Sequence, residues 1–358
     1  MRKVNVLLVD DAVVVRRLVS DVLSSEGYWE VSTAPNGRIA LMKLPQLKPD
    51  VIILDIEMPE MDGLETLKRI RQDNASIPII MFSTLTSRGA TATLEALTAG
   101  ANDYVTKPTS LFNRQAAVDQ IEESLVPRLK AFCGHLLGQR QPAPTLKRAR
   151  SARPEPTARI DAVVIGISTG GPNALVKVIP QLPANFPVPI LIVQHMPPMF
   201  TKVLADRLAA ASRLQVREAG HGMPVRPATV YLAPGGHHMT VTGSVEHPRI
   251  ALNQLPPENS CRPAADVLFR SVADVYGRHL LAVVMTGMGQ DGMLGCEVIR
   301  KKGGQILAQD EASSVVWGMP GHVVRAGLAD EVVPLNQMAH AIQKHVDIDR
   351  RKGLRAAG

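Results

Sequence analysis

The amino-acid sequence predicts an α/β protein with two doubly wound domains joined by a linker. Short apolar runs alternate with segments in which apolar residues recur at helical spacing, a pattern typical of parallel sheets covered by helices. This alternation occurs twice, in residues 1–125 and again in residues 159–348, and the stretch between them holds few large apolar residues. A chain of 358 residues also suits two domains of ordinary size.

The first domain, residues 1–125, is expected to contain a flavodoxin-like parallel sheet of five strands. The expected strands are Val4–Val9, Glu30–Thr33, Val51–Leu54, Ile77–Phe82 and Tyr104–Val105. The expected helices are Ala12–Ser25, one opened by Asn36 and Gly37, Leu64–Arg71, Thr91–Ala99 and Phe112–Leu129. Because strands and helices alternate, helices should cover both faces of the sheet.

Residues 126–158 are expected to form a flexible basic linker. They carry 7 Lys+Arg against 1 Asp+Glu, and their later part is rich in Pro, Arg, Ala and Gln. Such a composition cannot bury enough apolar surface to fold alone. The basic balance of the whole chain, +7, raises a nucleic-acid hypothesis. With only 3% aromatic residues, however, no base-stacking surface is evident, and no nucleic-acid partner is expected.

The second domain, residues 159–348, repeats the strand and helix alternation. The expected strands are Ala162–Ile167, Ile190–Val193, Thr229–Leu232, Met239–Thr242, Leu280–Met285 and Ile306–Ala308. The expected helices are Ala174–Ile179, Val203–Ala211, Ala264–Tyr276, Cys296–Lys302 and Met338–Val346. Residues 349–358 are small and basic, and a disordered tail is expected there.

Cysteine usage and hydropathy indicate a cytoplasmic protein. The three cysteines are widely separated and form no CxxC pair, so neither a disulfide framework nor a zinc site is expected. No apolar run approaches the roughly 20 residues that span a bilayer, and the apolar run near the start is too short for a signal peptide. Membrane insertion is therefore not expected.

Polar side chains follow the expected strands of the first domain where each strand ends. They are Asp10, Asp11, Asp55, Ser83, Thr84 and Lys107. The carboxyl ends of parallel strands meet at one edge of a sheet, where ligands bind. Crowded carboxylates repel one another, and a hard cation such as Mg²⁺ would relieve that repulsion. Mg²⁺ and a lysine could also neutralise a phosphoryl group transferred to an aspartate.

The first domain resembles the receiver domain of response regulators. The resemblance is carried by VDD (9–11), LDIEMPEMDG (54–63), the hydroxyl after IIMF (79–82) and DYVTKP (103–108). It implies that Asp55 accepts a phosphoryl group and that Asp10, Asp11 and Asp55 hold Mg²⁺ with the Glu57 carbonyl. The other implied roles are the switch hydroxyl Ser83, with Thr84 as the alternative, the aromatic Tyr104 that follows the switch, and the phosphate partner Lys107.

A candidate nucleophilic serine opens the second domain. The segment GISTG (166–170) fits the G-x-S-x-G pattern, in which glycines allow a sharp turn that exposes the hydroxyl of Ser168 at a helix N-terminus. A phosphate-binding loop is a competing interpretation, but the G-x-x-x-x-G-K-[ST] and G-x-G-x-x-G patterns are absent from this segment. A purely structural turn is the third interpretation.

Two further strand ends supply a base and a carboxylate for that serine. His195 follows the apolar run in LIVQHMP (191–197), and Asp291 lies in the glycine-rich loop MTGMGQDG (285–292). All three side chains should therefore meet at one sheet edge, as a Ser–His–Asp triad requires. The order differs from the Ser–Asp–His order of α/β-hydrolases, for which His322 would be the alternative base.

The second domain resembles the catalytic domain of the chemotaxis protein-glutamate methylesterases, the CheB family. The shared segments are IGISTGGPNAL (165–175), VQHMPPMFT (193–201), NSCRPAADVLF (259–269), MTGMGQDGMLG (285–295) and QDEASSVVWGMP (309–320). The resemblance implies that Ser168 is the nucleophile, His195 the general base and acid, and Asp291 the orienting carboxylate. It also implies that Thr169 steadies the imidazole and that the Met288 N–H stabilises the oxyanion.

The combined resemblance implies a phosphorylation-activated enzyme of sensory adaptation. It would hydrolyse glutamate γ-methyl esters, and deamidate certain glutamines, on the cytoplasmic helices of chemoreceptors. A chemotaxis histidine kinase would be the phosphodonor, and no cofactor is expected in the catalytic domain. One alternative is a response regulator of a related non-flagellar pathway that acts on another receptor, and the other is one that acts only through a binding partner.

Overall fold

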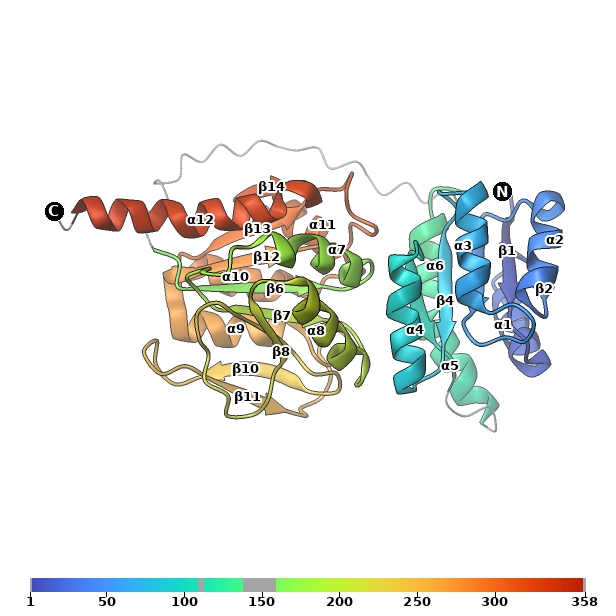
Figure 1. The fold of residues 1–358 in the computed structure, drawn as a ribbon, viewed down its shortest axis with the longest axis horizontal. Coiled ribbons are helices and arrows are strands. Elements are labelled where there is room, and N and C mark those ends of the chain that lie inside the picture. The colour runs from blue at the N-terminus through green and yellow to red at the C-terminus, as the bar shows by residue number, and fades with distance from the viewer. Residues whose placement is uncertain (1, 109–112, 138–158, 357–358) are drawn as a thin grey trace. The chain divides into compact units, whose positions relative to one another are not determined.

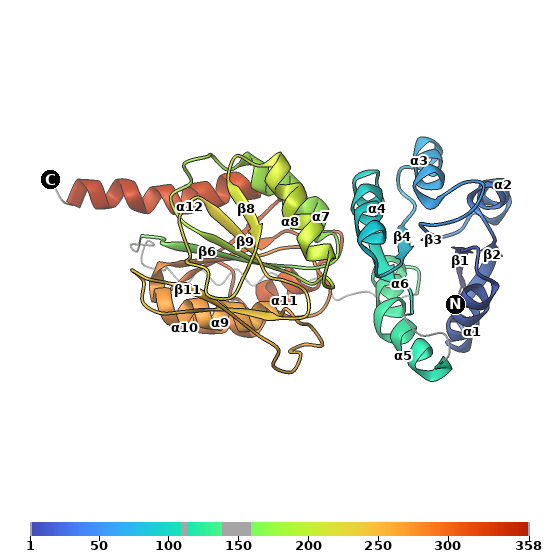
Figure 2. The same ribbon diagram turned by 60° about the horizontal axis from the view of Figure 1, so that its bottom comes forward.

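The computed structural model describes residues 2–108, 113–137 and 159–356, with side chains up to residue 347. The described residues form two compact units, one from the residues before 138 in the sequence and one from the residues after 158, and each unit is described by itself (Figures 1 and 2). Most of the expected linker, residues 138–158, lies outside the described residues. Within the described ranges, no helix is both long and apolar enough to cross a membrane.

The first unit is built on a parallel sheet of five strands, as expected. The strand order is β2-β1-β3-β4-β5. The strands are β1 (Val4–Val9), β2 (Trp29–Ala34), β3 (Val51–Asp55), β4 (Ile79–Ser83) and β5 (Asp103–Thr106). The order reverses between β1 and β3, so their carboxyl ends open a crevice where a ligand can bind.

Helices cover both faces of this sheet. They are α1 (Val13–Ser25), α2 (Gly37–Leu47), α3 (Gly63–Asp73), α4 (Ser87–Thr98), α5 (Arg114–Ser124) and α6 (Val126–Cys133). Buried side chains of α1, α5 and α6 pack with the sheet in one apolar cluster. Helix α4 begins before the expected Thr91 because the Thr86 hydroxyl caps it by accepting the Gly89 N–H at 2.9 Å.

The end of the first unit differs from the expectation. A single helix was expected over Phe112–Leu129, but α5 ends at Ser124 and α6 starts at Val126. Pro127 lies in the first turn of α6, where its missing N–H leaves no helical hydrogen bond unmade. In a continuous helix the same proline would remove one such bond, so the chain starts a new helix.

Helix α6 also corrects the expected start of the linker at residue 126. Leu129 and Cys133 are fully buried in the core of the first unit. Lys130 Nζ lies 2.8 Å from a carboxylate oxygen of Glu26 and 5.5 Å from the centre of the Tyr28 ring. The segment looked like linker because it is basic, but its apolar side chains lie on one helical face and belong to the first domain.

Leu129→Ala is expected to destabilise the first unit. The side chain is fully buried, and removing a buried leucine typically lowers the free energy of unfolding by about 2–5 kcal/mol. The measurement is denaturant unfolding of the full chain, followed by Trp29 fluorescence in a background with Trp317 replaced. The control is Ala131→Ser, at an exposed position of the same helix, with an expected change within about 0.5 kcal/mol. Equal effects of the two changes would contradict the assignment of α6 to this domain.

The second unit is built on a seven-stranded parallel sheet in the order β14-β13-β12-β6-β7-β9-β8. Its strands are β6 (Ala162–Ile167), β7 (Ile190–Gln194), β8 (Gln215–Glu218), β9 (Thr229–Leu232), β12 (Leu280–Val284), β13 (Gln305–Gln309) and β14 (Glu331–Val333). An antiparallel pair, β10 (His238–Thr242) with β11 (Arg249–Asn253), lies apart from this sheet. The prediction of a second doubly wound α/β domain is confirmed.

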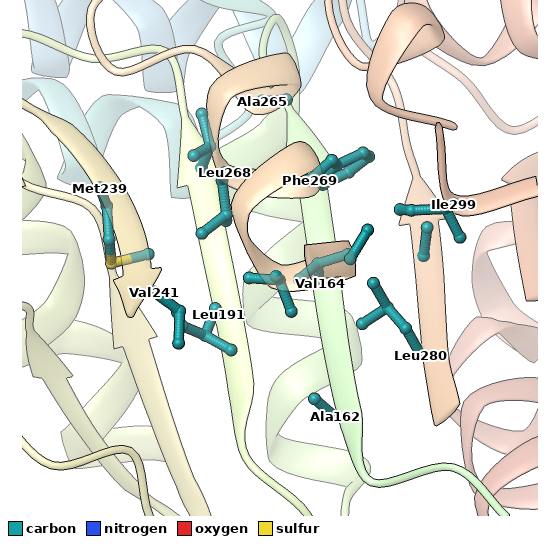
Figure 3. Close-up of a cluster of buried hydrophobic side chains, with 14 of the residues drawn as sticks. Ala162, Val164, Leu191, Met239, Val241, Ala265, Leu268, Phe269, Leu280 and Ile299 are labelled. Carbon is teal, nitrogen blue, oxygen red and sulfur yellow. The ribbon is translucent and has the colours of Figure 1, made fainter. Parts of the chain in front are cut away.

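Helices lie on both faces of the second sheet (Figures 1 and 2). One face carries α7 (Gly171–Val178), α8 (Phe200–Ala211) and α12 (Leu335–Ala356). The other face carries α9 (Ala265–Tyr276), α10 (Met293–Lys301) and α11 (Met319–Arg325). Figure 3 shows how α9 lies between the central strands and β10, with Leu268 and Phe269 in one apolar cluster with Val164 and Leu191 of the strands. This packing fixes the start of α9 at the carboxyl edge of the sheet.

Some elements of the second unit were not expected from the sequence. Strands β8, β11 and β14 and helix α11 are short, and β8 and β11 are partly exposed. Helix α12 continues to Ala356, which differs from the expected disordered tail at 349–358.

Candidate active site and phosphorylation site

The acidic side chains of the first unit meet at its sheet edge, as the strand-end pattern predicted. Oxygen atoms of Asp10, Asp11 and Asp55 all lie within 4.8 Å of one another. Lys107 Nζ reaches between two of these carboxylates, 2.8 Å from Asp10 Oδ2 and 2.7 Å from Asp55 Oδ2. Asp10 and Asp55 are buried, so their charges interact strongly.

This cluster has the donor set and charge of a divalent-cation site. Burial and the neighbouring Asp10 raise the pKa of Asp55 to about 6, although Lys107 opposes the shift. Three carboxylates beside one ammonium leave an excess of negative charge that a hard cation would neutralise. Asp10, Asp11 and Asp55 therefore fit Mg²⁺ by their chemistry.

The other receiver residues lie around this cluster, but not all of them contact it. Glu57 donates its backbone N–H to Asp55 Oδ1 at 3.4 Å. The Ser83 hydroxyl is fully buried and faces helix α4, where it donates to the Gly89 carbonyl at 3.2 Å and accepts from the Thr93 hydroxyl at 2.8 Å. Tyr104 is buried, and burial raises the pKa of its hydroxyl. None of the hydrogen bonds of the Ser83 hydroxyl goes to Asp55 in this arrangement.

In the second unit, Ser168 lies directly after β6 in a tight turn. Its N–H donates to the Thr286 carbonyl at 3.0 Å, and its carbonyl accepts the Gly171 N–H at 2.8 Å. Gly170 supplies the left-handed backbone that the turn requires, with φ of 78°. Helix α7 begins at Gly171, so Ser168 lies at a helix N-terminus, as the G-x-S-x-G pattern predicted.

His195 lies beside this serine on the neighbouring strand. Ile167 of β6 pairs with Gln194 of β7, so the next residue of each strand is Ser168 and His195, respectively. His195 Nε2 lies 2.7 Å from Asp291 Oδ2. Because Nε2 donates to this carboxylate, Nδ1 is the ring nitrogen that can accept a proton.

Asp291 is held by more donors than His195 alone. Its Oδ2 accepts the Ala265 N–H at 2.6 Å, and its Oδ1 accepts the Asp266 and Gly292 N–H groups at 3.0 Å each. The first two donors belong to the N-terminal turn of α9, where carboxylates are favoured. Burial raises the pKa of Asp291, but the hydrogen bonds from His195 and from this turn lower it by more. The net shift is downward, so the carboxylate stays ionised.

The imidazole is correspondingly favoured in its charged form. Burial lowers the pKa of His195, whereas Cys261, which hydrogen-bonds the ring, and the Asp291 carboxylate raise it, and the net shift is upward. An imidazole that is stabilised when protonated can store the proton of a serine during acyl transfer.

Two hydrogen bonds expected at this site are not formed by the described residues. No hydrogen bond joins the Ser168 hydroxyl to His195, and the buried Thr169 hydroxyl has no hydrogen-bond partner. The Met288 N–H likewise makes no hydrogen bond in the described ranges. Met288 follows Gly287, and a Cβ at Gly287 would lie 2.8 Å from Ser168 Cβ, so the Met288 amide is close to the serine.

The alternative base His322 and the buried His238 are engaged elsewhere. His322 Nδ1 lies 2.8 Å from the Gly318 carbonyl of its own helix. The buried His238 accepts the Ala264 N–H at 3.3 Å and donates from Nε2 to the Pro256 carbonyl at 3.1 Å. The geometry therefore pairs Asp291 with His195 rather than with the later histidine of the α/β-hydrolase order.

Several residues that touch this site were not singled out from the sequence. Gln194 donates its amide to the Ser168 carbonyl at 3.0 Å. Asn259, Cys261 and Asp266 contact Asp291 or His195. The last three lie in the segment NSCRPAADVLF, residues 259–269, which carried part of the family resemblance but gave no role to any of them.

The fold and the two sites define a class of protein. The first unit has the sheet order and acidic edge of a phospho-accepting receiver. The second is an α/β domain that presents serine, histidine and aspartate at adjacent strand ends, as serine hydrolases do.

Comparison with known proteins places the chain within this class. Residues 163–342 match the family described as CheB methylesterase, and residues 6–119 match the response regulator receiver domain. The protein-glutamate methylesterase/protein-glutamine glutaminase of Trichodesmium erythraeum is 49% identical over 97% of this chain and 100% of its own length. That of a Nocardioides species is 49% identical over 97% of this chain and 96% of its own.

A solved structure supports the same placement. The CheB methylesterase catalytic domain of Thermotoga maritima is 42% identical, with a TM-score of 0.51, and the match covers 52% of this chain and 99% of that one. The chain therefore belongs to the CheB methylesterase family and carries a response-regulator receiver domain. The two resemblances stated from the sequence are confirmed.

Proposed function

We propose that this protein is a phosphorylation-activated protein-glutamate methylesterase that acts on chemoreceptors. Its substrates would be glutamate γ-methyl esters and certain glutamines, because hydrolysis of either leaves a carboxylate. The relatives named protein-glutamate methylesterase/protein-glutamine glutaminase match almost the whole chain. The observation that carries the proposal is the 2.7 Å hydrogen bond between His195 and Asp291. His195 follows β7 directly, and β7 pairs with β6, the strand that Ser168 follows.

The reaction begins at Ser168. Its oxygen attacks the ester carbonyl carbon while its proton passes to Nδ1 of His195. The bond to the methoxy group then breaks, and the same proton leaves with methanol. Water next attacks the acyl-enzyme and gives a proton to His195, which passes it to the Ser168 oxygen as the acyl bond breaks. The glutamic acid that is formed then loses its proton to solvent.

The surroundings of Ser168 supply the rest of this chemistry. The Met288 N–H is close to the serine and has no other partner among the described residues, so we assign it as an oxyanion donor. The unpartnered Thr169 hydroxyl, which is 3% exposed, is assigned to the imidazole in its reacting position. Asp291 keeps the ring in one tautomer and offsets its positive charge.

The first unit supplies the control. Asp55 would accept a phosphoryl group from a chemotaxis histidine kinase, and Lys107, already 2.7 Å from Asp55, would pair with the phosphoryl oxygens. Asp10, Asp11 and Asp55, with the Glu57 carbonyl, would hold Mg²⁺, which neutralises charge during phosphoryl transfer. Ser83 would turn from helix α4 toward the phosphoryl group, and Tyr104 would follow it.

Methanol release from methylated chemoreceptor membranes tests this proposal. The full chain is incubated with the membranes and Mg²⁺, with and without a small phosphodonor. We expect methanol release in both cases and a faster rate with the phosphodonor. If the receiver becomes phosphorylated but no methanol appears, the protein acts on another receptor or only through a binding partner, and the proposal is wrong.

A further inference from the structure

A second buried carboxylate lies behind Asp291, and an asparagine links the two. Asn259 Nδ2 donates to Asp291 Oδ1 at 3.1 Å and to Asp266 Oδ2 at 3.0 Å. Asp266 is fully buried, and its Oδ1 accepts the Gly295 N–H at 2.6 Å. The hydrogen-bond chain therefore runs from His195 through Asp291 and Asn259 to Asp266.

The turn that carries Asn259 is firmly anchored. Glu258 and Cys261 exchange backbone hydrogen bonds at 3.1 and 2.9 Å. The Glu258 carboxylate receives two hydrogen bonds from Arg270 of α9, at 2.7 and 2.6 Å. Asn259 and Ser260 both have left-handed backbone, with φ of 52° and 59°. Left-handed backbone is strained for most residues but is adopted by asparagine and glycine, so the turn suits an asparagine at this position.

Among the described residues, no salt bridge is formed by Asp266. Arg270 of α9 interacts electrostatically with Asp266 and Asp291, but its guanidinium forms its salt bridge with Glu258. The other titratable groups that interact with Asp266 are Asp291 and the buried thiol of Cys296. Burial, together with Asp291, raises the pKa of Asp266 to about 6, against the Gly295 and Asn259 donors. The side chain thus places a second negative charge behind Asp291 near neutral pH, joined to it through the Asn259 amide.

We propose that Asn259 and Asp266 are positioning residues of the esterase site. Asn259 holds Asp291 Oδ1, which leaves Oδ2 aimed at the imidazole, and Asp266 orients the Asn259 amide while adding negative charge that favours the imidazolium. This inference rests on the proposed function, because its assay is ester hydrolysis.

The decisive variants are Asn259→Gly and Asp266→Asn in the full chain. Glycine keeps the left-handed backbone and removes the side chain that carries the amide, so we expect kcat to fall roughly ten- to a hundredfold with KM unchanged. Asp266→Asn keeps the volume and removes the charge. Since a lost negative charge makes the imidazolium less stable, the acidic limb of the kcat/KM profile should move down by roughly one pH unit. A merely structural role would not move this limb.

Ser260→Gly is the matched control, since it changes the next left-handed residue of the same turn but leaves the amide in place. It should keep kcat and the pH profile of the unmodified protein. Thermal unfolding of each variant identifies a loss that comes from misfolding. If folded Asn259→Gly retains kcat within twofold, or Asp266→Asn leaves the acidic limb unmoved, the inference is overturned. Absence of methanol release by the unmodified protein would instead overturn the proposed function.

Discussion

Replacing Ser168 with alanine should lower kcat for methanol release by roughly 10⁴- to 10⁶-fold, because the change removes the hydroxyl that forms the acyl-enzyme in the proposed reaction. The side chain is 8% exposed and lies in a turn whose backbone bonds do not involve the hydroxyl, so the fold should tolerate the change. Phosphorylation of Asp55 should be unaffected. The measurement is methanol release from methylated membranes, with receiver phosphorylation followed in the same samples.

The control for this prediction is Ser244→Ala, which removes an exposed hydroxyl from the loop between β10 and β11. Its rate should equal that of the unmodified protein. Full hydrolysis by folded Ser168→Ala would show that another residue is the nucleophile. Cys261, which hydrogen-bonds His195, would then be the first residue to test.

The strand-end rule explains why the main site residues could be predicted. Ser168, His195 and Asp291 each follow a buried apolar run, and buried runs in an α/β protein are parallel strands whose carboxyl ends align. The observed pairing of β12 with β6 and of β6 with β7 brings these ends together. The same rule predicted the meeting of Asp10, Asp55 and Lys107.

The supporting residues could not be predicted in this way. Asn259 reaches Asp291 only because two successive left-handed residues fold its turn back over the start of α9. Asp266 lies on the buried face of α9, where an apolar residue is the usual expectation. Neither position is marked by periodicity, and their roles depend on contacts between segments far apart in the chain.

Helix α6 shows the opposite case: the sequence contained the apolar spacing of a packed helix, but the basic composition of the segment led to the prediction of a linker. Val126, Leu129 and Cys133 recur at helical spacing and are buried, yet the surrounding basic residues indicated a solvated linker. Lys130 and Arg128 reconcile the two observations, since each pairs with a carboxylate of the first domain. Charge in this segment therefore attaches the helix to the domain.

Asp55→Asn should abolish stimulation of methanol release by the phosphodonor and leave a basal rate. An amide cannot form the aspartyl phosphate, and the change removes one of the three carboxylates that fit Mg²⁺. It also removes the partner that Lys107 contacts at 2.7 Å. The measurement is the ratio of methanol release rates with and without phosphodonor, which should fall to about one, with no phosphorylated protein detected.

The control is Asp73→Asn, an exposed carboxylate at the end of α3, whose loss should leave both phosphorylation and stimulation intact. Stimulation that persists in Asp55→Asn would mean that the phosphodonor acts at another residue or directly on the esterase. Loss of the basal rate as well would mean that Asp55 supports hydrolysis without phosphorylation. Either result would contradict a receiver that controls a complete esterase site, because Ser168, His195 and Asp291 all belong to the second unit.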